Sequence, residues 1–101
     1  MRVIAIRVLR DFWETHPAAE APLKAWLGEA KAASWQTPAD IKARYANVSI
    51  LKSRRVVFNI KGNDYRLIAA VAYQFGAIYI KFVGTHKQYD AINADTVEIG
   101  P

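Results

Sequence analysis

The sequence predicts an α+β protein in which an N-terminal strand and two to three helices pack on one face of a small antiparallel β-sheet. Two observations support this fold class. Residues 7–45 carry apolar side chains at helical spacing, and residues 56–85 contain β-rich runs separated by turn glycines. With 101 residues, of which 52% are hydrophobic, the chain is expected to form a single domain over residues 1–101.

The first half of the chain contains the predicted helices. Residues 2–6 are β-rich and suit an edge strand added to the later sheet. A helical period begins at residue 7 and is ended by Pro17, and a second helix is expected over residues 18–33. The sequence TPAD at the start of residues 37–45 is a capping signal that opens a short third helix.

Turn residues indicate how the strands pair. A two-residue turn at residues 62–63, Gly-Asn, places Asn59 opposite Arg66. A second two-residue turn, at residues 75–76, places Arg66 opposite Thr85 on a third strand. The sheet is therefore predicted to contain two consecutive hairpins.

In this register, alternation divides the side chains between a core face and an open face. The predicted core face carries Val56, Phe58, Ile60, Tyr65, Leu67, Ala69, Val71, Tyr73, Ile78, Ile80 and Phe82. The open face is cationic, with Asn59, Lys61, Arg66, Tyr79 and Lys81, and His86 follows just beyond the third strand.

The positive charge of the chain is concentrated on the first hairpin. The formal net charge is +5, and residues 52–66 alone contain five basic side chains against one acid. A localised basic patch favours a polyanionic partner, of which nucleic acid is the commonest. The alternative is an edge hairpin that lysine and arginine merely keep soluble.

Composition limits the remaining classes of protein. The chain has no cysteine, which excludes disulfides and thiolate chemistry. The longest apolar run, residues 67–73, is far shorter than the ~20 residues of a membrane span. Only four apolar residues lie between Arg2 and Arg7, too few for the core of a signal peptide. We therefore expect a cytoplasmic protein without a membrane partner. Separately, residues 91–101 carry little pattern and are expected to form a loosely held tail.

The candidate chemistry centres on His86. If residues 84–90 leave the sheet in one helical turn, then His86, Tyr89 and Asp90 are neighbours. No second histidine lies at metal-ligand spacing and no glycine-rich phosphate loop occurs, so neither a metal nor a cofactor is expected. An imidazole, a tyrosine and several cations suit RNA cleavage by attack of the ribose 2′-OH on the adjacent phosphate.

Three segments resemble one known family. FNIKGNDYRL at residues 58–67, YIKFVGTHKQYD at 79–90 and DFWETHP at 11–17 are similar to the HigB toxins of the RelE-like superfamily. The resemblance implies a RelE-like fold and cleavage of mRNA on the translating ribosome. It also implies neutralisation by a HigA antitoxin with a helix-turn-helix domain, through which the complex would bind operator DNA.

The resemblance also implies roles for individual residues. Lys61 and Arg66 match the phosphate-binding lysine and arginine of the superfamily, His86 falls where other members place a catalytic arginine or histidine, and Tyr89 matches the tyrosine of the HigB motif. His86 is expected to act as general acid or as general base, and Lys61 is an alternative base if neighbouring cations lower its pKa. RNA or ribosome contacts are expected from Lys52, Arg54, Arg55, Asn59 and Lys81.

Two other functions are compatible with the same fold. ParE-like members of the superfamily poison a topoisomerase without cleaving RNA, and a basic sheet can also serve as a non-catalytic RNA-binding module. Residue chemistry at the site, and not the fold, must distinguish these functions.

Overall fold

Five strands form one mixed sheet in the order β1-β5-β4-β3-β2. The computed structural model describes residues 1–99. The strands are β1 (Arg2–Ile4), β2 (Ser49–Ile50), β3 (Arg55–Ile60), β4 (Tyr65–Ala72) and β5 (Ala77–Thr85). The helices are α1 (Ile6–Thr15), α2 (Glu20–Ala32), α3 (Pro38–Arg44) and α4 (His86–Asp90), with 3₁₀ turns η1 (Pro17–Ala19) and η2 (Tyr73–Phe75). The predicted α+β class is confirmed, and β1 is an edge strand that pairs in parallel with β5.

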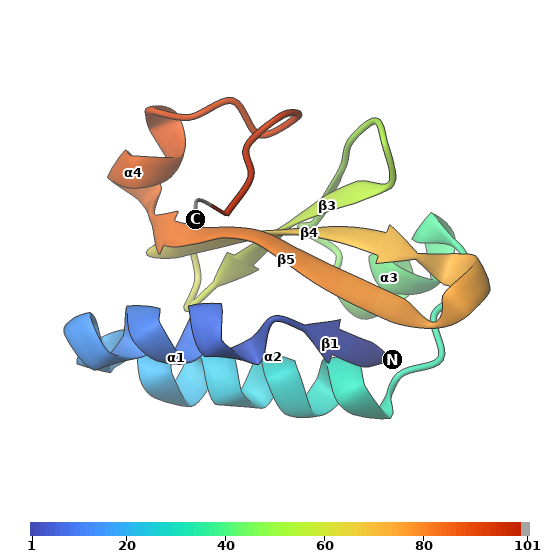
Figure 1. Cartoon of the computed structure of the whole chain (residues 1–101), viewed down its shortest axis with the longest axis horizontal. Helices are drawn as coiled ribbons and strands as arrows, with labels where there is room; N and C mark the ends of the chain where they lie inside the picture. Colours follow the sequence, from blue (N-terminus) through green and yellow to red (C-terminus); the bar gives the residue numbers. More distant parts are fainter. Residues whose placement is uncertain (100–101) are drawn as a thin grey trace.

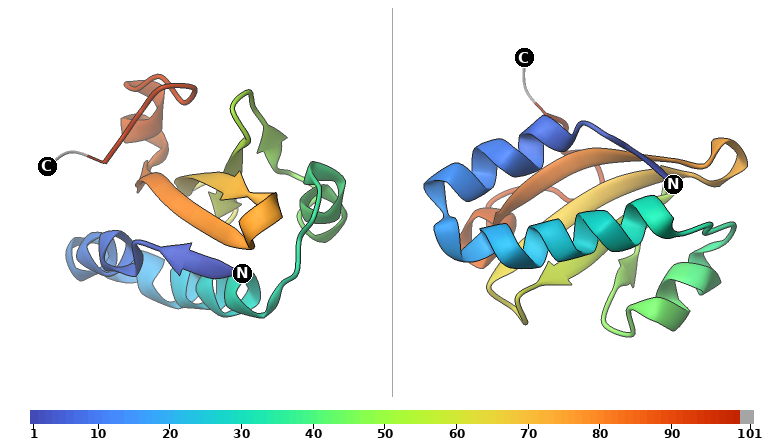
Figure 2. Two further views of the ribbon diagram at one scale, coloured as in Figure 1. Left: turned by 45° about the vertical axis from the view of Figure 1, so that its right-hand side comes forward. Right: turned by 90° about the horizontal axis from the view of Figure 1, so that it is seen from below.

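The two long helices cover one face of the sheet. Figures 1 and 2 show α1 and α2 side by side beneath the strands, whereas α4 and the C-terminal segment lie on the opposite side. Pro17 ends α1 as predicted, but the chain makes the turn η1 before α2 begins at Glu20. The predicted cap of the third helix is confirmed, because Thr37 and Asp40 form a capping box at the start of α3.

An aromatic cluster fills the core between the helices and the sheet. Trp26 of α2 packs edge-on against Phe58 of β3 at 5.2 Å between ring centroids, and Trp35 lies 6.3 Å from the same ring. Phe58 is fully buried, and each such side chain contributes about 1.5–3 kcal/mol of hydrophobic stabilisation. Leu9 and Leu67 complete the contact between α1, α2 and β4 and are also inaccessible to solvent.

The first hairpin has the predicted register. Asn59 pairs with Arg66, and Ile60 pairs with Tyr65 as the last pair before the turn. Gly62 has a φ of +63°, which glycine adopts without the steric cost of a side chain. Turn chemistry and hydrophobic alternation were therefore sufficient to predict this hairpin.

The predicted turn of the second hairpin is wrong. β4 and β5 close at the pair Ala72 and Ala77, and the connection contains η2 followed by Gly76 at a φ of +63°. The chain therefore uses a four-residue connection in place of the predicted two-residue turn. The register differs by two residues at this end of the hairpin, so Tyr79 keeps its predicted face and pairs with Ala70.

A β-bulge at Lys81 changes the register a second time. Ala69 pairs with Ile80, but Ile68 pairs with Phe82, so Lys81 is the extra residue of β5. The bulge moves Phe82 to the face opposite the main core, where the sequence had wrongly predicted a core position. The bulge also places Arg66 opposite Gly84, whereas the predicted partner of Arg66 was Thr85. Apolar residues lie on both sides of Lys81, so the sequence continues the regular alternation and does not predict the bulge.

The C-terminal segment is attached to the sheet, contrary to the prediction of a loosely held tail. Residues 94–99, called the C-terminal strap below, cross the face opposite α1 and α2 (Figure 1). The Arg55 guanidinium donates hydrogen bonds to the carbonyl oxygens of Ala94 at 3.2 Å and Val97 at 2.6 Å. This buried arginine supplies the attachment that the sequence pattern of the tail did not reveal. The last two residues of the predicted tail, 100–101, lie outside the described residues.

Candidate nuclease site

The candidate site is the corner where β5 ends and α4 begins. Arg66 is the second residue of β4 and pairs with Gly84, two residues before His86. His86 is the first residue of α4, which follows β5 without an intervening loop. The hairpin turn between β3 and β4 reaches the same corner, because the backbone N–H of His86 donates to the carbonyl of Asp64 at 3.1 Å.

A capping box fixes the first turn of α4. Thr85 accepts a hydrogen bond from the backbone of Gln88, and the Gln88 side chain accepts one from the backbone of Thr85 at 2.8 Å. These bonds satisfy donors that the start of a helix leaves unpaired. The Thr-x-x-Gln spacing was visible in the sequence and could have identified this cap.

Arg66 and Tyr89 are in direct contact. The guanidinium carbon of Arg66 lies 5.7 Å from the centroid of the Tyr89 ring, within the range of a cation–π interaction. One guanidinium nitrogen also donates to the carbonyl of Asn63 at 3.0 Å, which fixes the side chain against the hairpin turn. The remaining guanidinium donors are available to a phosphate, which arginine binds with a planar fork of N–H groups.

Carboxylates accompany the two other predicted catalytic residues. His86 Nε2 lies 3.7 Å from Asp90 Oδ1, as expected from their i, i+4 spacing on the predicted helical turn. Lys61 Nζ lies 3.6 Å from Asp64 Oδ2 in the hairpin turn. The side chain of His86 is 57% exposed and that of Lys61 is 50% exposed, so both pairs are screened by water and contribute little to stability.

The structure therefore collects the four predicted catalytic residues at one open corner. An imidazole that can transfer a proton, a positioned guanidinium and a tyrosine ring lie on adjacent elements, with a half-exposed lysine on the hairpin turn. The corner is exposed, which suits a polymeric substrate.

The predicted RNA-contact residues divide into two groups. Lys52 and Arg54 are exposed in the connection between β2 and β3, where Arg54 has a φ of +59° and lines a cavity of about 370 Å³ beside Tyr79. Asn59 is half-buried and donates to the carbonyl of Asn47 at 3.4 Å. Asn59 pairs with Arg66 at the His86 corner, whereas Lys52 and Arg54 lie at the other end of β3.

The other two predicted contacts, Arg55 and Lys81, are engaged by the C-terminal strap. Glu98 accepts a hydrogen bond from Arg55 through one carboxylate oxygen at 2.5 Å and from Lys81 through the other at 2.8 Å. The hydrogen bond from Lys81, together with the charges of both cations, holds the pKa of Glu98 below its ordinary value. Glu98 was not identified from the sequence, since two isolated acids in the tail, Asp95 and Glu98, carry no recognisable pattern.

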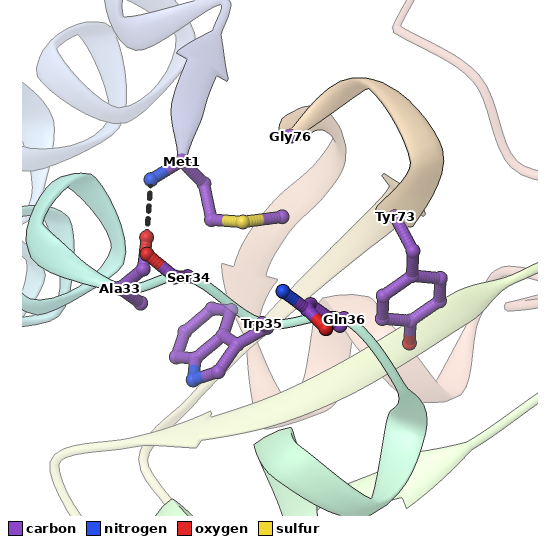
Figure 3. A pocket seen from close by; sticks show the side chains of 7 residues that line it. All are labelled: Met1, Ala33, Ser34, Trp35, Gln36, Tyr73 and Gly76. Carbon is purple, nitrogen blue, oxygen red and sulfur yellow. Dashed lines mark hydrogen bonds between the residues drawn. The ribbon is translucent and has the colours of Figure 1, made fainter.

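Other candidate sites are weaker. A cavity of about 240 Å³ lies at the opposite end of β5, lined in part by Met1, Trp35, Tyr73 and Gly76, and Figure 3 shows that it contains no cluster of catalytic groups. The N-terminal ammonium beside it donates to the carbonyl of Ala33 at 2.7 Å. Among residues 1–99, no group of three or more acidic or histidine side chains is placed to hold a metal ion. Within the same range, no helix is long and apolar enough to span a bilayer.

Comparisons with known proteins identify the family of the chain. Residues 19–92 match the family model described as HigB_toxin, RelE-like toxic component of a toxin-antitoxin system. The chain is 30% identical over 96 residues to the mRNA interferase toxin HigB of Escherichia coli strain K12, covering 93% of this chain and 92% of that protein. The mRNA interferases HigB of Escherichia coli O157:H7 and Shigella flexneri match to the same extent. The match covers β4, β5 and α4, which form the His86 corner, and the chain belongs to the HigB family of RelE-like toxins from toxin–antitoxin systems.

Proposed function

We propose that this toxin is an endoribonuclease that cleaves mRNA on the translating ribosome. The observation that carries the proposal is the Arg66 and Tyr89 pair beside His86 on one open corner of the sheet. The relatives named mRNA interferases support the same activity, because they match nearly the whole chain. A HigA-type antitoxin would neutralise the toxin, and the complex would bind operator DNA through the antitoxin.

The proposed reaction uses this chain's own side chains. The 2′-oxygen of one nucleotide attacks the adjacent phosphorus, the bond from phosphorus to the 5′-oxygen breaks, and a 2′,3′-cyclic phosphate and a 5′-hydroxyl form. One group accepts the 2′ proton and another protonates the departing 5′-oxygen. His86 fills one of these roles, and Lys61 or Tyr89 is available for the other. Arg66 stabilises the negative charge that develops on the phosphate oxygens.

The openness of the corner supports the proposed dependence on the ribosome. The side chain of His86 is 57% exposed and that of Lys61 is 50% exposed. A site of this kind does not by itself hold the 2′-oxygen, the phosphorus and the 5′-oxygen in line, and such alignment supplies a large share of the rate. The ribosome would supply it by presenting the message in a fixed conformation.

Primer extension on a reporter mRNA after brief induction tests the proposal. We expect wild-type toxin to produce new 5′ ends only when the reporter is translated. His86→Gln should lower the cleavage rate about 10²–10⁴-fold and Arg66→Ala about 10²–10³-fold. Lys87→Gln is the matched control, because Lys87 is an exposed neighbour on α4 without a proposed role. Reporters without a start codon provide the untranslated comparison.

Each alternative function predicts a different result. Growth arrest with intact mRNA would replace the proposal with topoisomerase poisoning. Salt-sensitive RNA binding without new ends would indicate a non-catalytic RNA-binding module. Wild-type cleavage by a folded H86Q protein would remove His86 from the mechanism.

A further inference from the structure

We propose that Arg55 and Lys81 form a second phosphate site for single-stranded RNA, which the carboxylate of Glu98 occupies in the free toxin. The inference rests on the proposed function for the identity of the ligand. It concerns a different part of the sheet, since Lys81 lies five residues before His86, about 16 Å along an extended strand. The site would bind a phosphate of the same RNA strand away from the bond that is cut.

The two cations already hold one anion. Arg55 projects from β3 and Lys81 from the bulge of β5, with β4 between them. Their nitrogens lie 2.5 Å and 2.8 Å from the two oxygens of a single carboxylate, Glu98. Two oxygens of a phosphodiester present a similar pair of acceptors, and arginine is well suited to bind them. Glu98 therefore stands in for the phosphate that this pair of cations can bind.

The carboxylate can leave without unfolding the C-terminal strap. The side chain of Glu98 is 58% exposed, whereas that of Arg55 is 7% exposed and that of Lys81 is 25% exposed. Arg55 also binds the carbonyls of Ala94 and Val97, which keep the strap in place if Glu98 moves away. An incoming phosphate replaces the carboxylate as the anionic partner of the buried Arg55 guanidinium, so the exchange leaves no buried charge unpaired.

Glu98 neutralises two cations, Arg55 and Lys81, on a face of the sheet that is otherwise basic. Without Glu98, Lys81 would add to the positive potential that Lys52 and Arg54 already provide on this side of the sheet. The Glu98 carboxylate therefore competes with RNA phosphates for these two cations. An RNA strand that is bound at the His86 corner has a high local concentration at the second site, so one of its phosphates displaces the carboxylate.

Binding of a non-cleavable 2′-O-methyl RNA oligonucleotide, measured over a series of salt concentrations, tests the second site. Glu98→Gln frees both cations, and we expect tighter binding and a salt dependence steeper by about 0.7 in log K against log salt, as for one additional phosphate contact. Glu20→Gln is the matched control. Like E98Q, this substitution removes a carboxylate that pairs with a lysine, since Glu20 Oε2 lies 2.5 Å from Lys24 Nζ. Glu20, however, lies on α2 beneath the sheet. The control should leave the slope at its wild-type value.

A second substitution identifies the cation responsible. Lys81→Gln in the E98Q background should return the slope to the wild-type value. An E98Q protein that binds no better than E20Q, including one that does not bind at all, would overturn the second site. A gain that survives in the E98Q/K81Q double variant would also overturn it. These outcomes do not depend on cleavage, so they are distinct from a failure of the nuclease proposal, which the H86Q comparison would reveal.

Discussion

Gly84 is the position where the structure makes its sharpest prediction about stability. This buried glycine of β5 pairs with Arg66, and a Cβ atom added to it would lie 2.5 Å from the tip of the Phe82 ring. The same Cβ would lie 2.9 Å from the side-chain oxygen of Gln88. Both distances are too short for carbon, so Gly84→Ala must displace the ring, the amide or both.

The cost can be estimated from what these neighbours do. Gln88 accepts the hydrogen bond from Thr85 that caps α4, and moving it leaves that donor to water. Overpacking of this kind costs about 1–3 kcal/mol. For a domain of this size, each kcal/mol lowers Tm by about 4–8 °C, so G84A should melt at least about 4 °C below wild type. Displacement of α4 should also slow mRNA cleavage, because His86 begins that helix.

Gly28→Ala provides a control with the same chemical change and the opposite expected sign. Gly28 lies in α2, where an added Cβ meets no atom within 4 Å. Alanine there should stabilise the helix by up to about 1 kcal/mol. Thermal denaturation of the two variants followed by circular dichroism makes the comparison. A G84A protein that melts at or above the wild-type temperature would show that Phe82 and Gln88 move without cost, and the packing argument would be refuted.

Two further predictions concern polar side chains, one buried (Arg55) and one partly buried (Tyr45). Arg55→Ala should lower the free energy of unfolding, measured by urea denaturation, by about 2–3 kcal/mol, because it leaves the carbonyls of the strap without their donor. Arg54→Ala, at an exposed neighbour, should change it by no more than about 0.5 kcal/mol. Burial, with the hydrogen bond to Glu29, raises the pKa of Tyr45 to about 12 from 10.0. The folded chain therefore retains this proton while the unfolded chain loses it, so stability should fall as pH rises from 10 to 12, and Tyr45→Phe should reduce that fall. Equal slopes in both proteins would contradict the assignment.

The elements of this fold that depend on local signals could be predicted from the sequence. The Thr37 capping box, the helical periods of α1 and α2 and the turn at Gly62 each arise within a few residues. The pairing of Asn59 with Arg66 followed from that turn. The position of Arg66 relative to β5 was predicted to within one residue, opposite Thr85 where the structure has Gly84, although the predicted second turn is wrong. This is why much of the candidate corner could be assembled from the sequence.

The features that could not be predicted depend on contacts between distant residues. The ion pair of Arg55 with Glu98 joins residues 43 positions apart, and nothing near either residue indicates it. Val57 and Ile68 pair with each other and are buried, but they lie outside the main core cluster. β3, β4 and β5 bury apolar side chains on both faces in this region. The alternation of apolar and polar residues therefore could not reveal the bulge in the sequence.

The bulge at Lys81 makes the position of the corner depend on the length of β5 as well as on its composition. If one residue were deleted between Ile80 and Phe82, the ladder would become regular, and every following side chain would exchange faces. His86 would then begin α4 from the side of the sheet that packs on α1 and α2. Substitutions at Lys81 preserve the residue count, and an insertion of two residues preserves parity. Among homologous toxins, changes in the length of this strand should therefore occur in pairs, even where its residues vary freely.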